Sequence, residues 1–281
     1  MKFSIITISY NPGRLIKDTV DSVLSQDYPN IEYIIIDGGS TDGTAAMVKS
    51  YDSSISKYIS EPDNGIYDAL NKGIALATGD VIGLVHSDDF YADGSVLSSI
   101  AKTFDTSKAQ AVYGDLVYVS RDNTDRIIRY WQSGSFNPAR LKFGWMPPHT
   151  AFYATKDVYE KARLANGQYF DTSYTIASDY DFMMRVIAKL KIYPVYIPKV
   201  FVKMRAGGAS NKSIRNVIRK SREDYRAIRR NNIGGFGTFL AKNFRKLPQF
   251  FWRKPAENKT GHPTIGNQIP TTHSHLISES R

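Results

Sequence analysis

The sequence contains no cysteine. Disulfide bonds, thiolate metal ligands and a cysteine nucleophile are therefore excluded. The enzyme mechanisms that depend on a cysteine side chain are excluded as well. A reducing compartment such as the cytoplasm is compatible with this composition. The chain also lacks an apolar run near the roughly 20 residues that a membrane-spanning helix needs. Its first residues, with one Lys before a short apolar stretch, predict a strand and no signal peptide.

Positive charge is concentrated in one part of the chain. The formal net charge is +10, and residues 212–254 carry 13 Lys and Arg residues but only two acids, Glu223 and Asp224. The rest of the chain is therefore close to neutral. The basic character is a property of one surface segment and gives no information about the fold.

The first part of the chain alternates between strand and helix patterns. With 281 residues, of which 42% are hydrophobic, the chain is long enough for one α/β domain and an appendage. We expect strands at 2–9, 31–36, 56–60 and from 81, and helices at 11–26, 41–50, 66–77 and 95–104. These repeats predict an α/β fold with a doubly wound, mostly parallel sheet and right-handed connections.

After about residue 110 the pattern becomes mixed. Strands are expected at 111–120, 126–132, 151–154, 192–197 and 200–204, and helices at 156–164 and 180–189. We therefore predict a nucleotide-binding half at 1–110 and an acceptor-side half of the same catalytic domain at 111–211. A basic helical appendage at 212–254 and a disordered tail at 255–281, rich in polar residues and Pro, complete the chain.

Two adjacent acids follow the apolar run that begins at Val81. Asp88 and Asp89 would lie at the carboxyl end of a buried strand, where open α/β sheets bind their ligands. Neighbouring carboxylates repel each other unless a cation lies between them and an anionic substrate. Oxygen ligands suit Mg²⁺ or Mn²⁺, and a diphosphate would complete the coordination. The alternative is a solvated turn or a helix cap.

Four motifs together resemble a known enzyme family. They are Thr7–Asn11, Asp37–Thr44, Glu61–Gly73 and Ser87–Asp89, in the order and spacing of the expected strand ends. With them the chain resembles the family-2 glycosyltransferases of the GT-A fold, and the Glu61–Gly73 stretch is similar to the bacterial polysaccharide-assembly branch. The resemblance extends from about residue 2 to about residue 210.

The resemblance implies an activity and its substrates. A family-2 enzyme moves a hexosyl or N-acetylhexosaminyl group from a nucleotide-diphosphate donor, here by preference UDP, to a hydroxyl group with inversion. The acceptor would be a glycan, in particular a lipid-linked one, in surface polysaccharide synthesis. The implied cofactor is Mn²⁺ or Mg²⁺.

The resemblance also assigns roles to individual residues. Tyr10 would pack against the donor base, and Asp37 would accept its N–H. Asp88 and Asp89 take the place of the family's metal-binding acids, with Asp89 as the direct ligand and Asp88 beside the donor. Asp179 matches the position of the catalytic base.

Two departures from the family pattern affect these roles. Ser178 stands where a Glu usually precedes the base, and Asp181, two residues further on, is a second candidate for it. His86 stands where the first acid of the metal motif is often found, so the number of metal ions stays open. Asp179 could also act only as a helix N-cap.

Further residues are candidates with a structural alternative. Asp68, at the start of an expected helix, could reach the donor ribose or stabilise the turn before it. Arg205 precedes a glycine-rich stretch at 206–210, and we expect a mobile lid from which Arg205 or Lys203 contacts the diphosphate. The alternative is a plain glycine-rich turn. His149 could hydrogen-bond a phosphate or the acceptor, although a lone His is more often structural.

The chemistry explains why these acids must come from distant parts of the chain. The largest change of charge is on the departing diphosphate, which a cation can neutralise. The acceptor hydroxyl needs a carboxylate to remove its proton, and such help is worth roughly 10²–10⁴-fold in rate. That base must lie opposite the leaving group.

The basic segment has the pattern of an interfacial helix. Apolar and aromatic residues at 214–228 and 239–252 are interleaved with Lys and Arg, as in helices that lie on anionic membranes. We therefore expect an enzyme that is peripheral on the cytoplasmic face of the cell membrane. Alternatively, the apolar stripe docks on the catalytic domain and the charges stay in solvent.

Two other functions stay open at this point. A phosphoryl-transfer or receiver-type domain also gathers acids at strand ends around Mg²⁺, although its acids usually begin after the first strand. A nucleic-acid-binding protein could use the basic segment, but strand-end acids would repel the phosphates. We expect no nucleic-acid partner.

Overall fold

The computed structural model describes residues 1–207 and 214–244. In this part of the chain the strands are β1 (Phe3–Ser9), β2 (Ile31–Asp37), β3 (Lys57–Ser60), β4 (Val81–Leu84), β5 (Phe90–Tyr91), β6 (Ala111–Val119), β7 (Ile127–Trp131), β8 (Phe152–Thr155) and β9 (Val195–Arg205). The α-helices are α1 (Leu15–Leu24), α2 (Thr44–Lys49), α3 (Ile66–Leu76), α4 (Val96–Ser107), α5 (Lys156–Lys161), α6 (Ser178–Met184), α7 (Ile214–Arg230) and α8 (Phe236–Phe244). Short 3₁₀ turns are η1 (Asp52–Ser54), η2 (Pro138–Phe143) and η3 (His149–Ala151), and the π-helical turn η4 (Arg185–Lys189) continues α6.

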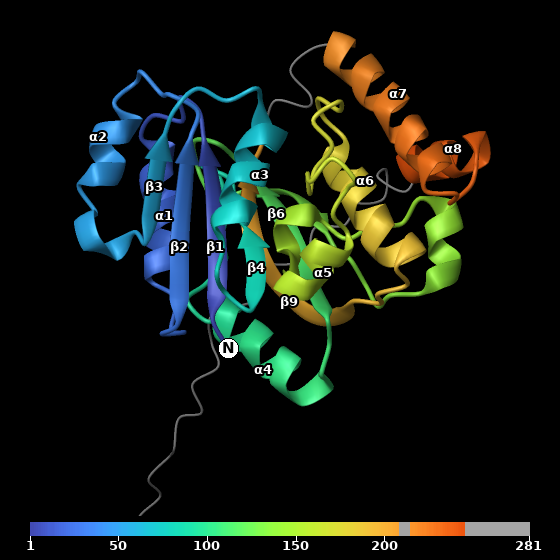
Figure 1. Ribbon diagram of the computed structural model, residues 1–281, viewed down its shortest axis with the longest axis horizontal. Helices are drawn as coiled ribbons and strands as arrows, with labels where there is room; N and C mark the ends of the chain where they lie inside the picture. Colours follow the sequence, from blue (N-terminus) through green and yellow to red (C-terminus); the bar gives the residue numbers. More distant parts are fainter. Residues whose placement is uncertain (208–213, 245–281) are drawn as a thin grey trace, which may run out of the picture.

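All described strands belong to one sheet. Its order is β3-β2-β1-β4-β8-β6-β9-β5, with β7 paired to β6. Strands β1 to β4 are parallel to one another, β8 is antiparallel to both β4 and β6, and β6 runs parallel to β9. Figure 1 shows the parallel strands with their carboxyl ends along one edge. The predicted mixed α/β fold is confirmed.

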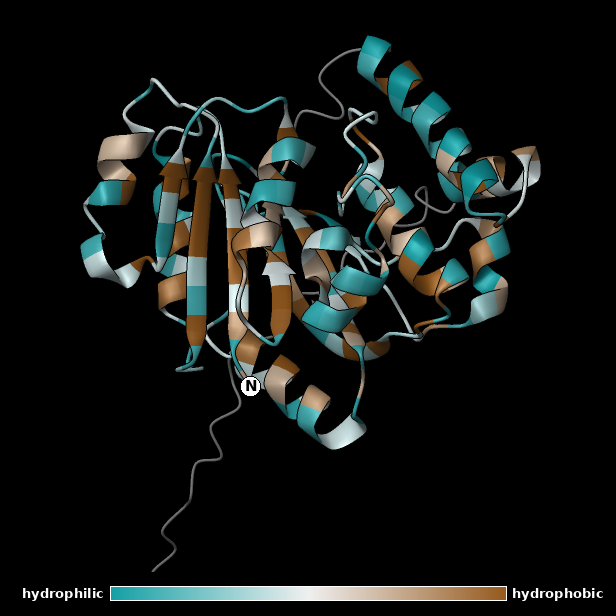
Figure 2. Cartoon of the chain, in the orientation of Figure 1, coloured by the Kyte–Doolittle hydropathy of each residue, from teal (hydrophilic) through white to brown (hydrophobic). Residues whose placement is uncertain are grey.

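The core lies on both faces of this sheet. Alternate residues of a strand point to opposite faces. Ile6 and Ile34 belong to a hydrophobic cluster that includes residues of α3, α5 and α6, while Ile5 and Ile35 belong to a second cluster that includes residues of α1 and α4. Strands buried on both faces read as continuous apolar runs, and this is the pattern of the first two strands in sequence. Figure 2 shows the hydrophobic residues concentrated in these central strands.

The first half of the chain folds close to the predicted pattern, except at the start of α1. The helix predicted from residue 11 begins only at Leu15, and Asn11 has φ 49°. Its side-chain Oδ1 accepts a hydrogen bond from the Thr41 amide at 2.8 Å. Asn11 therefore links the loops after β1 and β2 at the carboxyl edge of the sheet, where a ligand would approach.

The second half contains a strand that the sequence pattern divided. Residues 195–205 form the single long strand β9, where two strands were predicted. β9 pairs with β6 along most of its length and also with the two-residue strand β5, which was not predicted. This second pairing brings Lys203 beside Phe90, so the end of β9 lies next to the predicted metal motif.

The basic helices α7 and α8 pack on the domain next to α6 and η2 (Figure 1). Ala227 and Ile228 of α7 are fully buried, whereas Val217 and Ile218 are about half exposed. The predicted apolar stripe is thus divided: its C-terminal part docks on the domain and its N-terminal part faces solvent. None of the described helices combines the length and apolar character needed to cross a membrane.

A buried ion cluster fixes α7 to α8. Asp224 accepts hydrogen bonds from Lys242 at 2.6 Å and Lys220 at 2.9 Å. Burial raises the pKa of Asp224, but the two ammonium groups outweigh it and lower the pKa to about 2. At the same contact, Gly144 has φ 70°, and a Cβ there would lie 2.5 Å from the Lys242 Cα. The close approach of η2 and α8 therefore requires glycine.

Candidate functional site

The first three strands bring polar residues together at the carboxyl edge of the sheet. The register pairs Ser9 of β1 with Asp37 of β2, and Asp37 with Ser60 of β3. Tyr10 follows β1 and is 69% exposed, with its ring beside Gly38. An exposed aromatic ring over a glycine offers a flat surface against which a planar base can pack.

Asp37 is fully buried at this edge. Its carboxylate accepts hydrogen bonds from the Ser40 amide at 3.0 Å, the Ser40 hydroxyl at 2.5 Å and the Ser60 hydroxyl at 2.7 Å. These contacts make Asp37 the anchor of the loop after β2. For Asp37 to contact a ligand directly, Ser40 or Ser60 must give up its hydrogen bond to the Asp37 carboxylate.

Asp68 and Asn71 of α3 hold neighbouring loops. Asp68 Oδ2 accepts the Asn64 amide at 2.9 Å and lies 3.7 Å from Lys72 Nζ. The Asn71 side chain donates to the Phe170 carbonyl at 2.8 Å and accepts the amides of Tyr169 and Phe170. In this structure both side chains therefore stabilise loops, and Asp68 keeps partial exposure to solvent.

Asp88 and Asp89 lie in the turn between β4 and β5. Asp89 is 1% exposed, and its Oδ1 accepts the Arg205 amide at 3.2 Å. Burial and the neighbouring Asp88 raise the pKa of Asp89 well above its ordinary value. Asp88 is more exposed than Asp89. The pair therefore combines a carboxylate held inside the protein with one that reaches solvent.

Arg205, at the end of β9, closes over this pair. One guanidinium nitrogen donates to the Asp88 carbonyl at 2.8 Å, another contacts the Asp18 carboxylate of α1, and the group lies 4.8 Å from the Phe90 ring centre. The residue is 4% exposed, and among the described residues none accepts a hydrogen bond from its buried Nε. In this arrangement Arg205 fixes the backbone of the metal motif. Most of the predicted lid, from Gly208, lies outside the described residues.

The acids fit a divalent cation when a diphosphate supplies further oxygens. Within residues 1–207 and 214–244, no cluster of three or more His, Asp or Glu side chains could hold a metal by itself. Mg²⁺ is usually bound by one or two carboxylates together with substrate phosphates and water. Asp89 has one oxygen to which no described residue donates a hydrogen bond, and a cation there would relieve the repulsion that raises its pKa.

Asp179 lies in the first turn of α6, on the other half of the sheet. Its side chain is 19% exposed. Oδ1 accepts the Tyr67 hydroxyl of α3 at 3.3 Å, and Oδ2 lies 3.2 Å from His149 Nδ1. The residue before α6 makes no side-chain cap, and Asp179 itself does not cap the helix. The carboxylate is held from two sides and keeps access to solvent.

A pair of histidines connects Asp179 to the metal motif. His149 Nε2 lies 2.7 Å from His86 Nε2, and His86 is two residues before Asp88. Burial, with a smaller contribution from His149, lowers the pKa of His86 to about 3. His86 is therefore neutral at pH 7 and can share one proton with His149. The sequence named both histidines but did not predict that they touch.

The Tyr118 side chain of β6 interacts electrostatically with both Asp89 and Asp179. Burial raises the pKa of the Tyr118 hydroxyl, Arg129 opposes the rise, and Asp89 and Asp179 both add to it. Both carboxylates therefore lie within electrostatic range of one side chain near the end of β6.

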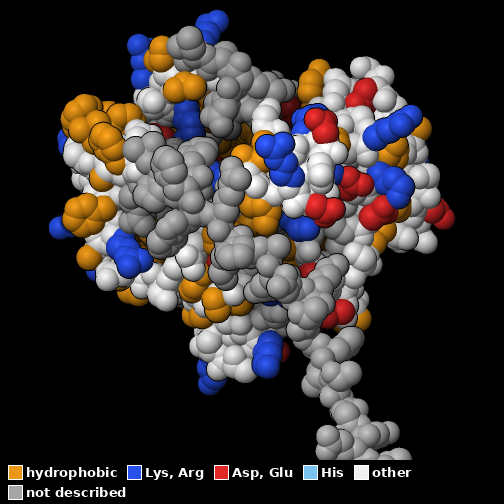
Figure 3. All heavy atoms as spheres, turned by 180° about the vertical axis from the view of Figure 1, so that it is seen from behind, with side chains coloured by type: hydrophobic (Ala, Val, Ile, Leu, Met, Phe, Trp, Pro, Cys, Tyr) orange, Lys and Arg blue, Asp and Glu red, His pale blue; other side chains and the backbone are white. Residues whose placement is uncertain are grey.

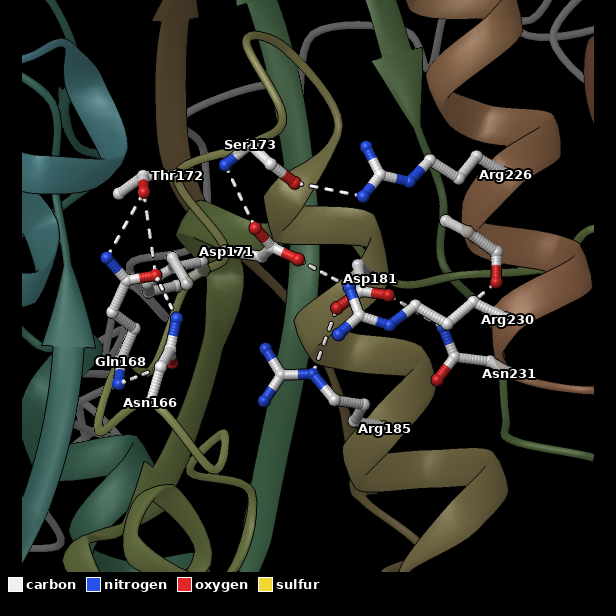
Figure 4. A network of polar contacts seen from close by, with 12 residues as sticks. Asn166, Gln168, Asp171, Thr172, Ser173, Asp181, Arg185, Arg226, Arg230 and Asn231 are labelled. Carbon is white, nitrogen blue, oxygen red and sulfur yellow. Dashed lines mark hydrogen bonds and ion pairs between the residues drawn. The ribbon is translucent and has the colours of Figure 1, made fainter.

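Asp181, the second candidate for the base, lies in a buried network (Figure 4). It is 0% exposed, pairs with Arg185 at 3.0 Å and accepts a hydrogen bond at 2.9 Å from Asn231, the residue directly after α7. Its two oxygens are used inside the protein. Of the two acids, only Asp179 is open to a substrate.

Glu223 of α7 is a site neighbour that the sequence analysis missed. Its carboxylate accepts the amides of Thr175, Ile176 and Ala177, directly before α6. The sequence contained a signal for this role, because Glu223 and Asp224 are the only acids in the basic segment 212–254. Acids in such a segment are expected to have specific partners.

Comparison with known proteins places this geometry in a family. The model of glycosyl transferase family 2 matches residues 4–160. An uncharacterised glycosyltransferase of Mycobacterium tuberculosis is 31% identical over 210 residues, which cover 74% of this chain and 76% of that protein. A PGL/p-HBAD biosynthesis glycosyltransferase of Mycobacterium bovis is 26% identical over 214 residues, covering 74% of this chain and 79% of its own length.

Solved structures share the fold. The crystal structure of Staphylococcus aureus TarS 1-349 has a TM-score of 0.64 and 19% identity, and covers 87% of this chain and 72% of that one. The match covers 40% of a longer TarS chain. The mannosyltransferase PcManGT of Pyrobaculum calidifontis, solved with GDP-Man and Mn²⁺, has a TM-score of 0.60 and 17% identity and covers 89% and 73%.

These findings decide between the functions that the sequence left open. The match to the family model spans more than half of the chain and includes the loops after β1, β2 and β4. The chain belongs to glycosyl transferase family 2, has the GT-A fold and is a glycosyltransferase.

Proposed function

We propose that this enzyme transfers a hexosyl or N-acetylhexosaminyl group from a nucleotide-diphosphate donor to a hydroxyl of a glycan acceptor, with inversion. UDP is the favoured nucleotide. TarS 1-349 has been solved in complex with UDP and with UDP-GlcNAc, and PcManGT with GDP-Man. A relative of this chain is a PGL/p-HBAD biosynthesis glycosyltransferase.

The observation that carries this proposal is the connection between Asp179 and the pair Asp88 and Asp89. Asp179 comes from α6, and the pair follows β4, yet His149 and His86 link them by contacts of 3.2 and 2.7 Å. A displacement needs a base on one side of the reacting carbon and charge stabilisation on the other. The two groups of acids can supply these functions.

Asp179 is the base in this proposal. As the acceptor oxygen bonds to the anomeric carbon, its proton passes to the Asp179 carboxylate, and the bond from that carbon to the diphosphate breaks. The nucleotide diphosphate leaves with the electron pair. Tyr67 and the His149 ring hold the carboxylate in place, and the burial of Asp181 supports the choice of Asp179.

The donor side is formed by the loops after β1, β2 and β4. Tyr10 packs against the base, and Asp37 shapes the loop that borders it and contacts the base when one of its serine partners turns away. Asp88 and Asp89 would hold a Mn²⁺ or Mg²⁺ ion, which supplies charge neutralisation for the leaving diphosphate. Arg205 fixes the backbone of these acids and reaches the diphosphate only if its contact with Asp18 opens.

Helices α7 and α8 suit a lipid-linked acceptor at the cytoplasmic face of the membrane. Phe236 and Phe244 are each 64% exposed on α8, and Ile218 is 50% exposed on α7. Figure 3 shows hydrophobic side chains beside Lys and Arg at the edge that carries these helices. Apolar side chains among basic ones are typical of surfaces that bind anionic lipid. The predicted boundaries of this appendage, 212–254, stay a prediction.

The proposal is tested with a panel of sugar nucleotides. Thermal stability is measured with UDP-glucose, UDP-galactose, UDP-GlcNAc and GDP-mannose, each with and without Mn²⁺, and released nucleotide is quantified. We expect one donor to raise the melting temperature only when Mn²⁺ is present, and slow release of its nucleotide with water as acceptor.

Two results would contradict the proposal. One is the lack of any Mn²⁺-dependent stabilisation and of nucleotide release across the whole panel. The other is a product sugar that keeps the anomeric configuration of the donor, measured by NMR at early times. The second result would preserve the enzyme class but exclude single displacement with Asp179 as base.

A further inference from the structure

We infer that Glu223 of α7 is a positioning residue for the proposed base Asp179. The inference rests on the proposed function of Asp179. Glu223 lies 44 positions after Asp179 in sequence and does not touch it. Glu223 binds the residues immediately before α6. Helix α7, which lies outside the residues matched by the family model, therefore determines the position of the base.

The contacts of Glu223 are unusually complete for a side chain on a basic helix. Oε1 accepts the Thr175 amide at 3.0 Å, and Oε2 accepts the amides of Ile176 at 2.8 Å and Ala177 at 3.0 Å. The residue is 9% exposed. Hydrogen bonds from neutral donors to an ionised carboxylate are about twice as strong as those between neutral groups, so this segment has one strongly preferred position.

The same segment is held at its other end by the arginines of α7. Arg226 donates to the Ser173 hydroxyl at 3.0 Å, and Arg230 contacts the Asp171 carboxylate (Figure 4). Contacts from one helix thus extend over residues 171–177. Because α7 is rigid over this length, the segment cannot shift without breaking several of them together.

Position matters here because Asp179 follows Ala177 by only two residues. A general base must approach the hydroxyl proton at hydrogen-bond distance, and a displacement of about 1 Å can cost roughly 10²-fold in rate. The donor-side residues lie at the ends of β1, β2 and β4 and in the loops that follow, and among the described residues no hydrogen bond or ion pair joins them to residues 175–177, the partners of Glu223. Loss of Glu223 should therefore reduce kcat and leave donor binding unchanged.

The experiment compares Glu223→Gln with the parent enzyme and with Asp157→Asn as a matched control. Asp157 is a solvent-exposed acid that forms an ion pair with Lys161, on the same short helix. Rates of nucleotide release from the active donor are divided by the number of UDP-binding sites found by calorimetry, which removes any unfolded fraction. We expect kcat per site to fall about 10-fold to 100-fold in Glu223→Gln, with KM for the donor and the control variant unchanged.

Two further measurements separate positioning from general destabilisation. In a background of Asp179→Asn, the substitution Glu223→Gln should no longer reduce kcat, because its effect passes through the base. Amide hydrogen exchange at 175–177 should accelerate in Glu223→Gln while exchange in β1 and β2 stays unchanged. If Glu223→Gln does not fold, Glu223→Asp replaces it, since it keeps the charge and withdraws the carboxylate by one methylene.

The outcomes distinguish this inference from the proposed function. A parent enzyme that releases no nucleotide from any donor overturns both. A parent enzyme that is active, with kcat per site equal in Glu223→Gln, overturns the positioning role alone. An equal loss of kcat with and without Asp179 would also overturn it, because the effect would then not pass through the base.

Discussion

His149 lies between two groups that are far apart in sequence, with its Nδ1 3.2 Å from Asp179 Oδ2 and its Nε2 2.7 Å from His86 Nε2. We expect His149→Ala to lower kcat by about 10-fold to 100-fold, a part of the roughly 10²–10⁴-fold contribution of general-base catalysis. In His149→Asn the amide nitrogen can replace Nδ1 as a donor, so this variant should recover part of the rate. Steady-state rates of nucleotide release check both variants, and equal losses in the two would contradict a role through Asp179.

Asp179 and Asp181 form a matched pair for testing the base. Asp179→Asn keeps the shape of a partly exposed side chain, and we expect a loss of about 10²–10⁴-fold in kcat with little change in stability. Asp181→Asn breaks a buried pair with Arg185, and should lower the free energy of unfolding by about 3–5 kcal/mol. Urea denaturation and turnover of the folded fraction distinguish the two. A larger loss of turnover in Asp181→Asn would reverse the assignment.

Asp89→Asn should separate stability from function. Burial and Asp88 raise the pKa of Asp89, so its ionised form is destabilising at neutral pH, and an amide of the same shape removes that penalty. The Asn oxygen can still accept the Arg205 amide. We expect a melting temperature equal to or above that of the parent without metal, together with loss of the Mn²⁺-dependent shift. A clear fall in stability without metal would show that the carboxylate is needed for the fold.

The exposed phenylalanines of α8 should contribute to membrane binding. Phe236→Ser combined with Phe244→Ser removes two exposed apolar side chains with little effect on the core. We expect weaker co-sedimentation with vesicles containing phosphatidylglycerol, and weak binding of the parent to pure phosphatidylcholine. Leu24→Ser, at a side chain that is 39% exposed on α1, is the control. Unchanged sedimentation of the double variant would exclude this surface.

The ion cluster of Asp224 predicts an acid-sensitive contact between α7 and α8. The folded pKa of Asp224 is about 2, below its ordinary value of 3.8. A group with a lowered folded pKa contributes stability above its unfolded pKa and loses it as the pH falls through the folded pKa. We therefore expect a loss on the order of 2 kcal/mol between about pH 4 and pH 2. Urea titrations of the parent and Asp224→Asn check this, since the variant should lack that part of the pH dependence.

The sequence predicted the first half of the fold well because its signals are local. Apolar runs followed by acids or glycines identify strands that end at the ligand edge, and the register of Ser9, Asp37 and Ser60 confirms that the ends align. Local signals failed at Asn11, where a helix was predicted to begin but the side chain accepts a hydrogen bond from Thr41 in another loop. Tertiary contacts override local preferences at such positions.

Contacts between distant residues could not be predicted from the sequence. The role of Glu223 depends on where α7 packs, and the pairing of His86 with His149 depends on η3 reaching β4. Periodicity gives the apolar face of α7 but not the extent of its burial, so Val217 and Ile228 looked equivalent although only Ile228 is buried. The choice between Asp179 and Asp181 likewise required knowledge of Asn231 and Arg185.

The hydrogen bond from the Arg205 amide to Asp89 spans 116 positions of the chain. During synthesis on the ribosome, the acids after β4 emerge long before β9 exists, and the segment before α6 emerges before α7. A growing chain that ends before these later segments contains the sequence motifs of the enzyme, but the residues that hold the motifs in position have not yet been synthesised. With the proposed roles of Asp89, Asp179 and Glu223, catalytic competence would be acquired late in translation, once β9 and α7 have folded.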